Sequence, residues 1–130
     1  MSFKEYRKPK YRKLLEDADL KRWYRNLGKG SIILADVYLR ALGRFCEHIK
    51  MTPKQFVKLS QKKMEDVTHD FIDELESEKK PSGDPKYSPG YMESYLKAIR
   101  SWAEWNRKPF KRKIKIRNAG KRPTLKEERS

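Results

Sequence analysis

Apolar residues recur at the three- and four-residue spacing of an amphipathic α-helix in three stretches of the chain. Each stretch follows a serine (Ser31, Ser60 or Ser88), and serine is a favourable N-cap because its hydroxyl can accept a hydrogen bond from a free backbone N–H group. The pattern predicts three long helices: about 32–49, the stretch after Ser60, and a third from Pro89 to near Asn106. Their apolar stripes are Leu34, Tyr38, Leu42, Phe45 and Ile49; Met64, Val67, Phe71 and Leu75; and Met92, Tyr95, Leu96, Ile99, Trp102 and Ala103.

The remaining segments predict shorter elements. Residues 52–55 (TPKQ) combine a capping box with proline at the first helical position, so a short helix is expected there. Between 11 and 27 the spacing predicts one or two short helical turns, which the GKG of 28–30 would break. The alternating KIKIR of 113–117 is typical of extended chain. The expected fold is therefore all-α, a compact bundle of four to five helices with basic N- and C-terminal arms.

Charge is distributed unevenly along the 130 residues, whose net charge is +15. The middle of the chain, 31–106, has twelve basic and twelve acidic side chains, whereas 1–30 has ten and four and 107–130 has eleven and two. The apolar residues are concentrated in the neutral part. We therefore expect three parts: a basic N-terminal arm (1–13), a helical core (14–106) and a basic linker (107–130).

This charge favours acidic partners, of which nucleic acid is the commonest and an anionic membrane surface the second. No apolar run approaches the ~18 residues of a membrane span, and the N-terminus lacks the apolar stretch of a signal peptide. Cys46 is the single cysteine, so it cannot form an internal disulfide, and we interpret it as a small buried hydrophobe. The expected location is cytoplasmic, in association with the nucleoid.

Signs of catalysis or metal binding are weak. His48 and His69 do not stand at metal-ligand spacing from each other or from Cys46. The GKGS of 28–31 lacks the leading glycine of a phosphate loop. No nucleophile–base pair is visible, so we expect neither an enzymatic activity nor a cofactor. The acidic cluster of Asp66, Asp70, Asp73 and Glu74 is interpreted as a solvated helix face rather than a magnesium site.

Signs of polyanion binding are stronger. Residues 107–122 (RKPFKRKIKIRNAGKR) carry nine Lys/Arg and no Asp/Glu, which predicts phosphate contacts with release of counterions. The three serine caps each stand close to lysines, so their helix N-termini are candidate anion sites, although each is also explained as an ordinary cap. The helix after Ser88 has a polar face on which Ser94 and Ser101 flank Lys97, and small side chains allow a helix to lie deep in a groove.

Four segments follow one another along the chain: Ser31–Ile33 with Tyr38–Phe45; Met64–Val67 with Phe71–Leu75; Ser88–Met92 with Tyr95–Trp102; and Arg122–Glu128. In this order and spacing they resemble the N-terminal core-binding (SAM-like) domain of tyrosine recombinases, the phage-integrase family, with an archaeal character. The resemblance implies a helical bundle that clamps duplex DNA together with a catalytic domain, DNA integration and recombination as the process, and recombinase protomers on DNA as partners. It also implies that the catalytic tyrosine belongs to a domain absent from this chain.

The resemblance also implies which elements face DNA, namely two of the bundle helices and the interdomain linker. Carried onto this sequence, the expected DNA-binding residues are Lys62, Lys63, Lys86, Ser88, Ser94, Lys97, Arg100, Arg107, Lys108, Lys111, Arg112, Lys113, Lys115, Arg117, Lys121 and Arg122.

Two other functions compete with duplex DNA binding. One is an RNA-binding helical domain, which would use exposed aromatic rings as stacking platforms. Here only Tyr87, Trp105 and Phe110 fall outside the apolar helix faces. The other is a protein-interaction module with solvated basic tails, whose binding would depend weakly on salt.

Overall fold

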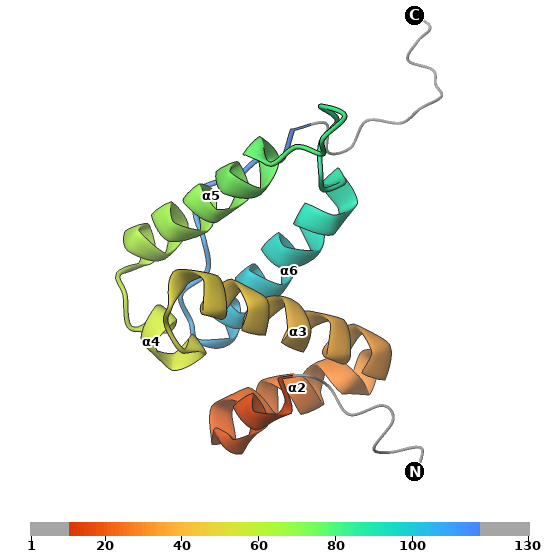
Figure 1. Cartoon of the computed structure of the whole chain (residues 1–130). Coiled ribbons are helices and arrows are strands. Elements are labelled where there is room, and N and C mark those ends of the chain that lie inside the picture. Colours follow the sequence, from red (N-terminus) through yellow and green to blue (C-terminus); the bar gives the residue numbers. More distant parts are fainter. Residues whose placement is uncertain (1–10, 118–130) are drawn as a thin grey trace, which may run out of the picture.

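The computed structural model describes residues 11–117 of the chain, and within them it is all-α. Five α-helices and one short 3-10 helix form the bundle, as the sequence pattern predicts (Figure 1). The elements are η1 (Arg12–Glu16), α2 (Ala18–Gly30), α3 (Ile32–Ile49), α4 (Pro53–Val57), α5 (Gln61–Ser77) and α6 (Pro89–Trp105).

Side-chain caps define where the helices begin. The hydroxyls of Ser31, Ser60 and Ser88 accept hydrogen bonds from the backbone N–H groups three residues later, at 3.1 Å in each case. Thr52 and Gln55 form both hydrogen bonds of the capping box at the start of α4. These caps, and the bounds of α3, confirm the prediction from the sequence.

Helix α2 is longer than the sequence pattern predicts. Instead of one or two turns that break at Gly28, a helix of 13 residues continues to Gly30. Its N-cap is Asp17, whose carboxylate accepts from the N–H of Leu20 at 3.0 Å. The two glycines occupy the last turn, and the N–H of Ser31 closes that turn on the carbonyl of Leu27 at 3.1 Å.

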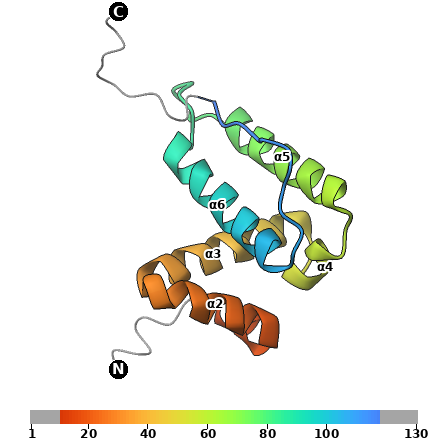
Figure 2. The same ribbon diagram turned by 180° about the vertical axis from the view of Figure 1, so that it is seen from behind.

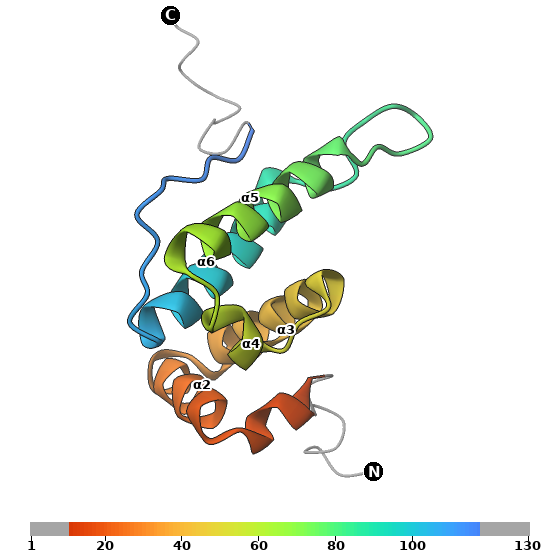
Figure 3. The same ribbon diagram turned by 90° about the vertical axis from the view of Figure 1, so that its left-hand side faces the viewer.

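The helices form two layers. In Figures 1 and 3, α5 and α6 lie side by side in one layer and α2 and α3 in the other. Helix α3 packs against both α2 and α6, and it therefore connects the layers. Trp23 of α2 and Trp102 of α6 are both almost fully buried where the layers meet, with ring centroids 5.3 Å apart in an edge-to-face arrangement. Because both indole N–H groups are satisfied, by Ser101 and by the carbonyl of Pro53, this contact has no polar cost.

The chain after α6 belongs to the core as far as Ile116, beyond the expected end of the helical core near Asn106. Residues 107–117 return along α5 and α6, seen in blue in Figures 2 and 3. The extended alternation is confirmed, because Ile114 and Ile116 are buried while Lys113 and Lys115, which alternate with them, are exposed. Phe110, expected from the sequence to be an exposed aromatic residue, is also buried, and that expectation is wrong.

Most of the expected N-terminal arm, residues 1–10, lies outside the described part of the chain. Tyr11 is buried and donates a hydrogen bond to Glu47 of α3 at 2.7 Å. The start of the described chain is therefore fixed to α3, and the core includes residues before position 14.

Candidate nucleic-acid interface

A groove of about 680 Å³ runs along the exposed face of α6. Its other walls are the end of α2, the start of α3 and residues 113–116. The floor is largely apolar and the rim is charged. The lining residues are Leu27, Leu34, Tyr38, Glu93, Leu96, Lys97, Arg100, Ser101, Glu104, Lys113, Ile114, Lys115 and Ile116.

Four of the basic residues predicted to bind DNA meet at this groove. Lys97 and Arg100 are three residues apart and therefore on the same face of α6. Lys113 and Lys115 approach from the returning segment, where the burial of the two isoleucines directs the lysines outward. The rim also carries Glu93 and Glu104, so its formal charge is +2.

Three other predicted residues are held in ion pairs. Lys62 is 3.1 Å from Asp66, and Arg112 is 2.7 Å from the other oxygen of the same carboxylate. The hydrogen bond from Lys62, and to a smaller extent that from Arg112, holds the pKa of Asp66 below its ordinary value. Lys86 lies 3.5 Å from Glu78, and the neighbouring Tyr87 and then Glu78 raise the pKa of this lysine. The pair of Lys86 with Glu78 and the side chain of Lys62 are exposed, so these lysines would exchange their partners for phosphate at little cost, whereas the pair of Arg112 with Asp66 is partly buried.

Lys108 has a structural role instead of the expected contact with DNA. Its ammonium group donates to the carbonyls of Val57 and Leu59, at 2.7 and 2.8 Å, and so satisfies the free carbonyl groups at the end of α4. Arg107, directly before it, has a positive φ of 65°, which turns the chain away from α6.

The serines predicted to face DNA are engaged within the protein. Ser88 caps α6. The hydroxyl of Ser94 donates to the carbonyl of Gly90, and that of Ser101 accepts from the indole of Trp23 at 3.0 Å. Ser94 also lines a separate pocket between α3 and α6 rather than the groove of Lys97. The small-residue face therefore does not act as one surface around Lys97.

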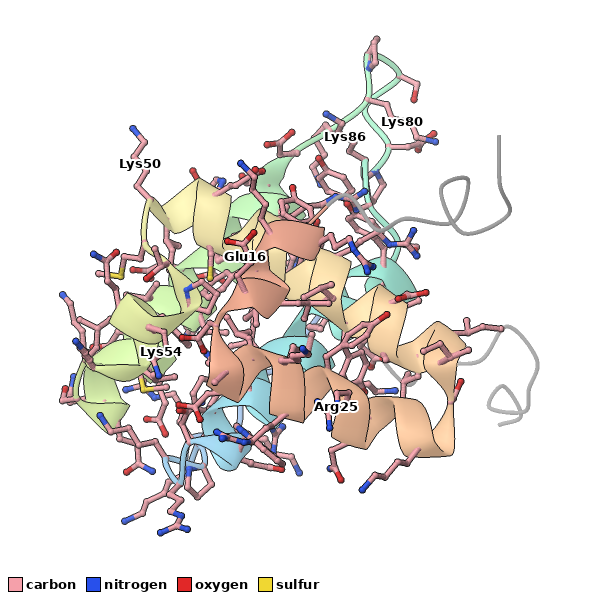
Figure 4. All side chains as sticks on the ribbon, turned by 90° about the horizontal axis from the view of Figure 1, so that it is seen from below. Glu16, Arg25, Lys50, Lys54, Lys80 and Lys86 are labelled. Carbon is pink, nitrogen blue, oxygen red and sulfur yellow. The ribbon has the colours of Figure 1, made fainter. Side chains whose placement is uncertain are left out.

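The remaining predicted residues are exposed or lie outside the described chain. The side chains of Lys63, Lys111 and Arg117 are exposed, although the backbone N–H groups of Lys111 and Arg117 donate to carboxylates of α5. Lys121 and Arg122 lie outside the described residues. Figure 4 shows that two cations outside the predicted set, Lys50 and Lys80, project from the loops after α3 and α5. Lys54 of α4 pairs with Asp19 at 2.7 Å.

The acidic side of α5 has a function that sequence reasoning missed. Glu65 is buried, and one of its oxygens accepts from the N–H groups of both Lys111 and Arg112, at 2.6 and 3.0 Å. Further along the helix, Glu76 accepts from the N–H of Arg117. These carboxylates hold the returning segment on α5. Within residues 11–117 no group of three or more His, Cys, Asp or Glu side chains is placed to bind a metal ion.

A second pocket, of about 290 Å³, lies between α3 and α6, and none of its functional groups except Ser94 was predicted. Arg40 and Arg44 enter it from α3, and Tyr91 and Tyr95 enter it from α6. The available signal was the pair of arginines one helical turn apart, but the contact with α6 depends on the tertiary structure.

Comparison of the chain with protein-family models, curated proteins and solved structures finds no match. Among the described helices, none has both the length and the apolar character that crossing a membrane requires.

Proposed function

We propose that this protein binds double-stranded DNA along the groove of α6. The observation that supports the proposal is the convergence of Lys97 and Arg100 of α6 with Lys113 and Lys115 of the returning segment. Cations from two separate elements that line one groove suit contacts with the phosphates of a DNA backbone. The net charge of +15 adds long-range attraction for the same partner.

The proposal agrees with the resemblance to the core-binding domains of tyrosine recombinases. In that interpretation the bundle is a DNA-clamping module, and catalysis belongs to a separate domain. Most of the proposed contacts are with phosphate, because lysine and arginine side chains neutralise phosphate charge whatever the base sequence. Binding is therefore tolerant of sequence and strongly dependent on salt.

The experiment is a fluorescence-anisotropy titration of a labelled duplex of about 30 base pairs across a salt series. Replacement of Lys97, Lys113 and Lys115 by Gln removes three cations, and the slope of log K against log salt should decrease by roughly two to three units, at about 0.9 per phosphate contact. A matched triple variant, Lys50→Gln, Lys80→Gln and Lys54→Gln, removes the same charge from other surfaces. Equal losses in both variants would contradict the groove as the binding site.

A protein-interaction module is the second candidate, favoured by one observation. Ile32, Ile33 and Leu34 are consecutive and exposed at the start of α3, with Ile33 67% accessible, and Leu34 borders the groove. Adjacent exposed apolar side chains are a common feature of protein interfaces. Two results together would support this candidate instead. The protein would bind no duplex at low salt, and the substitution Ile33→Ser would abolish self-association or partner binding.

A further inference from the structure

Two arginines of α3 line the pocket between α3 and α6. Arg40 and Arg44 are four residues apart, so their side chains leave the same face of α3 about one turn from each other. Among residues 11–117 no carboxylate lines the pocket, although Asp36 lies one turn before Arg40 on α3 and Glu47 accepts a hydrogen bond from Tyr11, which also contacts Arg44. Neither arginine forms an ion pair with a carboxylate anywhere in the described chain, in contrast to Arg112. Two guanidinium groups on one small cavity attract an anion with more than one negative charge.

The two tyrosine hydroxyls in the pocket are hydrogen bonded to each other. Arg44 hydrogen bonds to the hydroxyl of Tyr95, a contact that raises the pKa of the arginine. Burial raises the pKa of Tyr95 to about 12, so this hydroxyl keeps its proton at neutral pH. The two tyrosine oxygens are 3.0 Å apart. Either tyrosine can be the donor of this hydrogen bond, and when Tyr95 donates, the proton of Tyr91 is left for a ligand.

The aromatic rings hold these hydroxyls in place. Tyr87 stacks on Tyr91, with centroids 5.0 Å apart and planes at 11°. Tyr91 meets Tyr95 edge to face at 5.2 Å, and Tyr95 meets Phe71 of the core at 5.1 Å. This continuous series of rings, from the core to the surface, limits the side-chain entropy that binding would otherwise cost. Ser94 is not counted as a donor, because its hydroxyl proton is engaged by the carbonyl of Gly90.

We propose that this pocket binds a phosphate group, with Arg40 and Arg44 as the charged donors and Tyr91 as the hydroxyl donor. A phosphate monoester carries close to two negative charges at neutral pH and three strong acceptor oxygens, which matches two guanidinium groups and one hydroxyl. The ligand is inorganic phosphate or the terminal phosphate of a nucleotide. The site shares no lining residue with the groove of α6, so it does not depend on the proposed binding of DNA.

The test is an NMR titration of the whole ¹⁵N-labelled chain with inorganic phosphate, with chloride adjusted to keep ionic strength constant. We expect saturable shifts at the Nε–H signals of Arg40 and Arg44. Arg40→Gln and Arg44→Gln should each weaken binding at least about tenfold, and Tyr91→Phe, which keeps the ring stack, should weaken it several-fold. Arg25→Gln is the control, because this exposed arginine of α2 carries the same charge outside the pocket (Figure 4).

Two further arms define the ligand and the independence of the site. A nucleoside 5′-monophosphate that binds more tightly than inorganic phosphate identifies a terminal phosphate as the ligand, whereas equal affinities identify free phosphate. The variant without Lys97, Lys113 and Lys115 should keep phosphate binding unchanged, because those lysines line the other groove. Shifts that do not saturate, or an Arg25→Gln variant as impaired as Arg44→Gln, would overturn the proposal.

Discussion

The ring of Tyr11 packs directly on Gly43 of α3, so closely that a Cβ atom at position 43 would stand 2.4 Å from the Cγ of the tyrosine. Gly43 lies in the middle of an 18-residue helix, where glycine costs about 0.5–1 kcal/mol relative to alanine. The contact explains why the helix contains glycine at this point. It also fixes the start of the described chain across α3, next to the hydrogen bond from Tyr11 to Glu47.

We therefore expect Gly43→Ala to destabilise the protein despite the better helix propensity of alanine. The added methyl group must displace the Tyr11 ring, and overpacking of this kind typically costs about 1–3 kcal/mol. Urea denaturation measures the change. Gly28→Ala is the matched control, since its Cβ would meet Ile32 at an ordinary 3.5 Å, and it should stabilise α2 by up to about 1 kcal/mol. Stabilisation by both substitutions would contradict the close contact.

A second prediction concerns Glu65, the buried carboxylate that holds the returning segment. Glu65→Ala leaves the N–H groups of Lys111 and Arg112 without their acceptor, and we expect a loss of about 2 kcal/mol in the free energy of unfolding. Released from α5, the segment should be cut faster by trypsin at its lysines. Glu74→Ala, on the exposed part of the same helix, should leave the cleavage rate of 107–117 unchanged. Unaltered cleavage in Glu65→Ala would mean that the buried isoleucines alone hold the segment.

Glu65 and Gly43 illustrate where sequence reasoning ends. Helix positions were predictable because capping and apolar spacing are local, and α3 begins and ends where its serine cap and apolar stripe indicate. The common face of Lys97 and Arg100 was predictable for the same reason. The contacts of Glu65 with Lys111 and of Tyr11 with Gly43 span 46 and 32 residues of chain. They depend on how the layers pack, which neither periodicity nor charge counting specifies.

The same limit applied to the basic segment. Its composition predicted a basic linker that contacts phosphate, yet the alternation of lysine with isoleucine also allows one side of the segment to be buried. Burial of Phe110, Ile114 and Ile116 divides the cations between structural and exposed positions. Arg40 and Arg44 were overlooked for a related reason, because an arginine pair becomes a pocket only when the tyrosines of another helix meet it.

A third prediction concerns acid. Because Lys62 and then Arg112 lower the pKa of Asp66 from its ordinary 3.8, the folded state favours the ionised carboxylate. The ionised carboxylate therefore stabilises the fold fully at pH values above the pKa of the unfolded state. This contribution decreases as the pH falls through 3.8 towards the lower pKa of the folded state. Asp66→Asn should therefore reduce the loss of stability below about pH 4, as measured by urea midpoints from pH 6 to pH 2.5. Asp70→Asn, an exposed aspartate one turn further along α5, is the control and should reduce that loss less.

The last prediction separates a structural lysine from a binding one within the same basic segment. Lys108→Met removes the ammonium group that satisfies the carbonyls of Val57 and Leu59, so we expect a loss of about 1–2 kcal/mol in stability. Lys113→Met removes an exposed cation from the rim of the groove, and stability should change by less than about 0.5 kcal/mol.

Duplex affinity should show the opposite order. At a temperature where both variants are fully folded, Lys113→Met should weaken binding and reduce the salt slope by about one unit, because one phosphate contact is lost. Lys108→Met should leave both quantities nearly unchanged, since its charge faces the carbonyls at the end of α4 rather than the groove. Urea denaturation and anisotropy on the same two preparations make the comparison. Equal losses of affinity would mean that DNA responds to the total charge of the segment, not to the positions that burial of the isoleucines directs toward the groove.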